Sequence, residues 1–126
     1  MKRNWDTIRE ILIRLEEKSP EEHSLRCSSF PEEKRAEISY HIELLHEAGL
    51  IHGCISKEIM RAGPRDFSAI RLTWEGHELL DAIKSDTIWN KTKESFLSKG
   101  VSMTFELVKS VAINLASEFL KSNFKG

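Results

Sequence analysis

The sequence is short of the residues that mark specialised classes of small protein. Only two cysteines occur among its 126 residues, too few for a disulfide framework. Three prolines and six glycines exclude a collagen-like repeat and a low-complexity chain. No run of roughly 18 apolar residues is present, so no membrane span is expected. Neither charge dominates, because 19 Lys and Arg oppose 20 Asp and Glu; the whole chain gives no electrostatic argument for a nucleic-acid partner.

The first residues also lack the pattern of a secretion signal. The basic pair Lys2 and Arg3 is followed by no apolar run longer than residues 11–13. We therefore expect a cytoplasmic protein in which Cys27 and Cys54 stay reduced. What the chain does have is 40% hydrophobic and 31% charged residues, which predicts a folded domain with a real core.

A helix followed by a short strand is predicted at the start of the chain. Apolar residues recur at helical spacing after a cap at Asn4 or Asp6, and Ser19-Pro20 ends the helix. Leu25 and Cys27 then alternate with polar neighbours, which indicates a short strand.

A second helix is predicted over about residues 31–48. Its buried stripe consists of Ile38, Ile42 and Leu45, at spacings of four and three. Gly49 follows the helix and suits a left-handed C-terminal cap, a conformation that side chains with a Cβ resist.

A two-stranded hairpin is predicted next. Apolar residues gather over 51–59 and again over 67–72, and residues 61–66 (RAGPRD) between them have turn chemistry. Thr73 then caps a third helix that begins at Trp74.

Ser85-Asp86 can cap a further helix over about 87–99, which Gly100 ends, and a last helix is predicted over about 104–123. The expected fold is therefore mainly α with a small antiparallel β-hairpin, an α+β class. Residues 1–85 are expected to form one domain, and residues 86–126 a C-terminal helical extension.

Two stretches resemble bacterial winged-helix proteins. Residues 38–51 (ISYHIELLHEAGLI) are similar to the recognition helix and first wing strand of those proteins, and residues 72–80 (LTWEGHELL) to the end of the wing and the helix after it. The resemblance implies a winged helix-turn-helix domain over 1–85. In such domains the exposed face of the recognition helix enters the major groove of DNA and the wing contacts the backbone.

Nearly the whole chain also resembles a small uncharacterised family of bacteria and prophages, number 2513 among the domains of unknown function. The resemblance rests on the two motifs above, on Met1-Lys2-Arg3, and on residues 81–83 and 86–91. It implies a winged helix with a helical tail and supplies no activity.

The winged-helix resemblance yields a set of candidate contact residues. They belong to the second helix and to the wing: Ser39, Tyr40, His41, Glu43, Lys57, Arg61 and Arg65. The leading hypothesis is a DNA-binding transcription regulator of bacterial or prophage origin that acts as a dimer, with the wing cations on phosphates.

Charge is distributed unevenly along the chain. Residues 32–48 have a net charge of −3, from five glutamates and two cations. The net charge is +2 over residues 51–72, from four cations and two acids, and +3 over residues 84–126, from seven lysines and four acids. An acidic helix opposes phosphate, so the wing and tail would supply most of the attraction to DNA. The alternative hypothesis is a protein-interaction module that does not bind DNA and that uses the acidic helix, with Tyr40 and Leu44, to bind a basic or apolar partner.

The last predicted helix carries a wide apolar stripe. Its members recur at helical spacing: Phe105, Val108, Val111, Ala112, Leu115 and Phe119. Because an apolar face of this width must be covered, we expect it to pair with the same helix of a second copy in a homodimer. The alternative is packing within the chain, against the first helix and Trp74 or Trp89.

No pattern in the sequence indicates catalysis or a cofactor. A Gly-rich phosphate loop, a metalloprotease helix and a serine elbow are all lacking, so no enzyme is expected. Cys27, His46, His52 and Cys54 are spaced unlike the paired ligands of zinc sites, and no metal site is expected.

Overall fold

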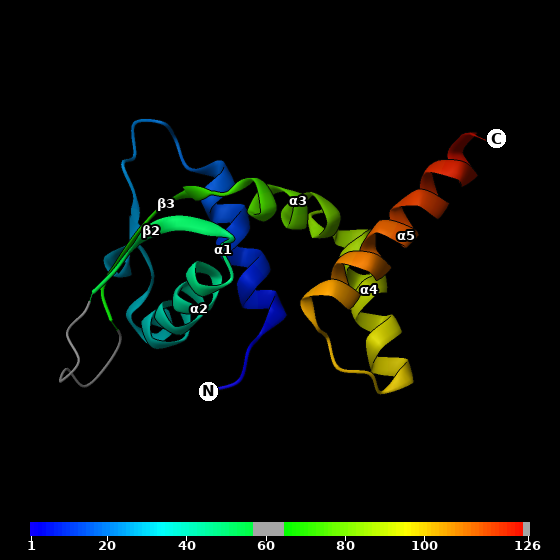
Figure 1. Cartoon of the computed structure of the whole chain (residues 1–126), viewed down its shortest axis with the longest axis horizontal. Helices are drawn as coiled ribbons and strands as arrows, with labels where there is room; N and C mark the ends of the chain where they lie inside the picture. Colours follow the sequence, from blue (N-terminus) through cyan, green and yellow to red (C-terminus); the bar gives the residue numbers. More distant parts are fainter. Residues whose placement is uncertain (57–64, 125–126) are drawn as a thin grey trace. The chain divides into compact units, whose positions relative to one another are not determined.

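The computed structural model describes residues 1–56 and 65–124 (Figure 1). Within these residues the chain forms five α-helices and a three-stranded antiparallel sheet, which confirms the α+β class. It divides into two compact units, Met1–His77 and Glu78–Gly126. In the described part of the chain, no helix is both long enough and apolar enough to span a membrane.

Helix α1 (Trp5–Glu17) begins where the sequence predicts. The Oδ1 atom of Asn4 accepts hydrogen bonds from the backbone N–H groups of Asp6 and Thr7, at 2.9 and 3.3 Å, which satisfies two donors that the first turn leaves free. The apolar face of α1 is buried in the N-terminal unit: Trp5, Ile8, Ile11, Leu12 and Leu15.

The sheet contains one more strand than the predicted hairpin. Its order is β1 (Leu25–Arg26), β3 (Phe67–Leu72), β2 (Ile51–Ile55), and both pairings are antiparallel. The hairpin of β2 and β3 is confirmed. The short predicted strand also exists and pairs with β3. Cys27 is not part of it, however, because this residue begins a 3₁₀ turn, η1 (Cys27–Ser29).

Helix α2 (Arg35–Glu47) follows a second 3₁₀ turn, η2 (Glu32–Lys34), whose N-cap is Pro31. Between β1 and α2 the chain therefore forms two short turns, where a helix-turn-helix would place a separate α-helix. Segments of three residues with a proline between them are too short for an α-helix. Helices α1 and α2 both contact the strands, and Figure 1 shows them beside the sheet.

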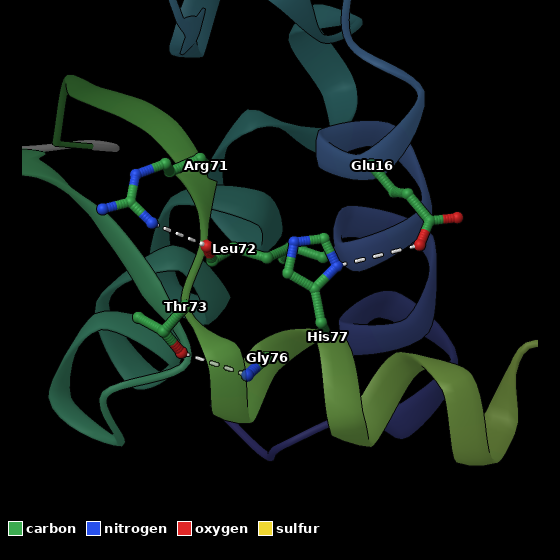
Figure 2. A network of polar contacts seen from close by, with 6 residues as sticks. All are labelled: Glu16, Arg71, Leu72, Thr73, Gly76 and His77. Atoms are coloured by element: carbon green, nitrogen blue, oxygen red, sulfur yellow. Dashed lines mark hydrogen bonds and ion pairs between the residues drawn. The ribbon is translucent and has the colours of Figure 1, made fainter.

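The start of α3 (Trp74–Ile83) lies very close to the end of α2 (Figure 2). Gly49 ends α2 at a φ of 75°, as the sequence predicts. The Thr73 hydroxyl donates to the carbonyl of Gly49 at 2.7 Å and accepts from the N–H of Gly76 at 3.0 Å. At Gly76 an added Cβ would collide with the carbonyl oxygen of Leu50, so only glycine fits there.

The C-terminal unit contains the helix pair α4 (Asp86–Lys99) and α5 (Phe105–Phe124), which pack against one another. The hydroxyl of Ser85 caps α4 by accepting from the N–H of Ile88 at 3.3 Å. Gly100 ends α4 at a φ of 65° and lets the chain reverse into α5. These caps agree with the sequence analysis.

Candidate functional site

Two residues predicted to face DNA or a protein partner are buried in the N-terminal unit. The ring of His41 is 0% exposed; its Nε2 accepts from the backbone N–H of Asn4 at 2.8 Å, and its Nδ1 lies 2.7 Å from the carbonyl of Glu37. The hydroxyl of Ser39 donates to the carbonyl of Arg65 at 2.7 Å. The predicted contact role of Ser39 and His41 is therefore wrong, because the rotation of α2 turns both side chains inward.

His41 belongs to a polar cluster that joins the beginning of α1 to α2. Glu37 Oε1 accepts from the Thr7 hydroxyl at 2.7 Å and from the Asn4 side-chain amide at 3.4 Å. We call Asn4, Thr7, Glu37 and His41 the α1–α2 clasp. Because a backbone N–H donates to Nε2, the hydrogen bond to the Glu37 carbonyl is donated by Nδ1, so both ring nitrogens of His41 are used in holding α1 and α2 together.

Two other predicted contact residues bind each other. The guanidinium of Arg65 lies 3.2 Å from Glu43 Oε1, with the two side chains 45% and 34% exposed. That carboxylate oxygen is itself buried, so Arg65 is the charge that compensates it. Arg65 is consequently a weaker candidate for a phosphate contact than the sequence indicates. Lys57 and Arg61 lie outside the described residues.

The outward face of α2 is acidic with an apolar centre. Tyr40 and Leu44 are half-buried on this face, and the ring of Tyr40 meets that of His41 edge-on, with 5.4 Å between centroids. Glu47 is exposed at the end of α2, and Glu33 is exposed in η2, the turn before the helix. This face attracts cations and repels phosphate.

The outer face of the sheet has the opposite charge, and the sequence analysis missed it. The register places Arg26 and Cys54 on either side of Ser68, and His52 beside Arg71. His52 and Cys54 are two residues apart in β2 and share a face, so the register shift between the two pairs leaves Ser68 and Arg71 on that face as well. Side chains that are neighbours across strands share a face, and Arg26, His52 and Arg71 are all exposed. None of the residues in β1, β2 or β3 is acidic. We call Arg26, His52, Ser68 and Arg71 the outer sheet face; finding it requires the strand register.

Figure 2 shows how the last residues of β3 meet α3. One guanidinium nitrogen of Arg71 donates to the carbonyl of Leu72 at 3.4 Å. Glu16 of α1 lies instead beside His77 of α3, with 3.9 Å between the carboxylate and Nδ1.

The apolar stripe predicted for dimerisation is largely used inside the chain. Val108 and Ala112 are fully buried, on the helix that packs against α4. Phe105, Val111 and Leu115 are half-buried, and Phe119 is exposed. Buried side chains are closed to a second copy, so the predicted role of Val108 and Ala112 in dimerisation is wrong.

Neither Cys27 nor Cys54 forms a disulfide bond. Over residues 1–56 and 65–124, no group of three or more His, Cys, Asp or Glu side chains is arranged to hold a metal ion.

The chain belongs to the family described as "Hypothetical protein (DUF2513)", which it matches over residues 2–102. It is 40% identical over 120 residues to a protein of Haemophilus influenzae described as "Uncharacterized protein", an alignment that covers 95% of this chain and 99% of that protein. No solved structure matches the chain. The resemblance to family 2513 seen in the sequence is thereby confirmed, and neither description states an activity.

Proposed function

We propose that the N-terminal unit is a winged-helix module that binds double-stranded DNA through the outer sheet face and the adjoining hairpin. The observation that supports this proposal is the separation of charge: the described strands carry exposed Arg26, His52 and Arg71 and no acid, whereas the outward face of α2 is acidic. Regulation of transcription in the cytoplasm is the role that such a module would serve.

Electrostatics decides which surface can approach DNA. Contacts to phosphate supply most of the affinity, and carboxylates at the interface oppose them. A recognition helix inserted into the major groove would bring Glu33 and Glu47 toward the backbone, at a cost that the ion-paired Arg65 offsets poorly. An antiparallel β-ribbon also fits the major groove, so the hairpin is a physically adequate alternative to the helix.

Replacing Arg26 and Arg71 together with glutamine is expected to weaken duplex binding. Each lost phosphate contact lowers the slope of log K against log salt by about 1, and we expect a loss of roughly tenfold in affinity per arginine near 50 mM salt. Fluorescence anisotropy with a labelled duplex, measured over a range of salt concentrations, gives both quantities.

Lys34→Gln is the matched control. Lys34 is an exposed cation beside α2, so its loss should leave DNA affinity within about twofold if the sheet makes the contacts. An effect of Lys34→Gln larger than that of the double variant would place DNA on α2 and contradict the proposed surface. No binding by the wild type near 50 mM salt would contradict DNA binding itself.

A protein partner on α2 is the second candidate function. The specific observation is that Tyr40 and Leu44 form an apolar centre with exposed glutamates around it. Interfaces commonly combine a buried aromatic anchor with a polar rim. This arrangement fits a basic segment with at least one apolar side chain.

Tyr40→Ala is expected to remove such a partner in a pull-down from the source bacterium. Truncation of an aromatic anchor typically costs about 2 kcal/mol or more of binding free energy, enough to lose a micromolar complex during washing. His46→Ala, an exposed change on the same helix, is the control. Retention of every partner by the Tyr40→Ala protein would show that this face is not the docking site.

A further inference from the structure

Helix α5 has a second stripe on the side away from its buried residues. Ser110, Ile113, Ser117 and Leu120 recur at spacings of three and four, which places them along one line of the helix. All four are exposed, Ile113 by 49% and Leu120 by 56%. We call these residues the α5 outer stripe.

We propose that the α5 outer stripe pairs with the same stripe of a second copy, with the two helices antiparallel. Small and large side chains alternate along it: Ser110, Ile113, Ser117, Leu120. When the helices run antiparallel, Ile113 lies opposite Ser117 of the second copy, and Leu120 lies opposite its Ser110. Each large side chain then meets a small one, which allows the close knobs-into-holes packing of an antiparallel coiled coil.

Charge at the two ends of α5 favours the antiparallel direction. Glu106 lies before the stripe and Lys121 directly after it, both exposed. An antiparallel pair brings Glu106 of one copy within about one turn of Lys121 of the other, whereas a parallel pair would align like charges. The opposed helix dipoles favour the same direction.

The self-complementary pattern is the reason to choose a second copy over another partner. A stripe in which large residues face small ones after a two-fold rotation satisfies the condition for an isologous interface. The twenty residues of α5 span about 30 Å, so one helix pair forms an interface at the small end of the known range. We therefore expect a dimer that dissociates on dilution. This inference does not depend on DNA binding.

The experiment is sedimentation or light scattering of the full chain from about 1 to about 500 µM. The mass is expected to rise from 14.5 kDa toward twice that value with concentration. Ile113→Glu should raise the dissociation constant at least tenfold, because it places two like charges in the helix contact. Leu97→Glu is the matched control: Leu97 is 85% exposed on α4, and its change should leave the dimer unaltered.

A charge exchange tests the orientation. Glu106→Lys alone and Lys121→Glu alone should each weaken the dimer severalfold, and the double variant should restore it, because only the antiparallel pair brings these two side chains together. Circular dichroism checks that each variant folds; the changes are at exposed positions. A monomer at every concentration, dimerisation of Ile113→Glu equal to wild type, or a double variant that is not restored would each overturn the proposal.

Discussion

Gly76→Ala is expected to lower the free energy of unfolding of the N-terminal unit by about 3 kcal/mol. In an ordinary helix this change gains up to about 1 kcal/mol, since alanine is the better helix former. Here the new Cβ would collide with the carbonyl oxygen of Leu50, which accepts the N–H of Thr73 at 3.0 Å. To make room, α3 must move away from Leu50 and weaken the two hydrogen bonds of the Thr73 hydroxyl, of which Figure 2 shows the one from the N–H of Gly76.

The measurement is denaturant or thermal unfolding, where a loss of this size shifts the midpoint by roughly 10–20 °C. Gly49→Ala is the control, because no atom lies within 4 Å of its added Cβ. Its cost comes only from a φ of 75° and should be about 1 kcal/mol. If Gly76→Ala is as stable as the wild type, the close approach of α3 to Leu50 is not a feature of the folded protein.

His41→Leu is expected to destabilise the N-terminal unit by about 2–3 kcal/mol. Leucine has a similar volume but cannot accept the N–H of Asn4 or donate to the carbonyl of Glu37. The Asn4 N–H is one of the donors that the start of α1 cannot satisfy within the helix, so the substitution leaves it without this partner at a partly buried hydrogen bond.

His41→Gln separates hydrogen bonding from packing. The glutamine carbonyl oxygen can accept near the position of Nε2, and about half of the lost stability should return. His46→Leu, an exposed change on the same helix, should alter stability by no more than about 0.5 kcal/mol. Equal losses for His41→Leu and His41→Gln would contradict the role assigned to the Asn4 hydrogen bond. All four proteins are compared by urea unfolding.

The sequence alone could not show which of the predicted contact residues on α2 are exposed. Helical spacing places Ser39, Tyr40 and Glu43 around α2, but it does not say which polar residue another segment will satisfy. The Ser39 hydroxyl donates to the Arg65 carbonyl, and the Glu43 carboxylate forms an ion pair with the Arg65 guanidinium. More than twenty residues separate the partners in each case. Tyr40, by contrast, is half-buried, and its ring meets that of His41 edge-on.

The positive surface was missed for a related reason. Arg26 and Arg71 are far apart in the sequence, and the short segment around Leu25 could be identified as a strand without knowing its neighbour. The β1–β3 pairing places Arg26 beside Ser68, and the register shift in the β2–β3 pairing brings Arg71 to the same face of the sheet. Register is a long-range property, because it depends on which strands meet.

The sequence by itself determined the α-helices and strands of this protein and several of their ends. Apolar periodicity marked the helices, and Asn4, Gly49, Ser85 and Gly100 marked boundaries, because capping and left-handed turns depend on a few adjacent residues. Only the tertiary structure decided which polar side chains are inside and which apolar side chains stay exposed. A polar side chain is buried when a distant group satisfies it, as in the α1–α2 clasp, and an apolar one stays exposed when no segment covers it, as on α5.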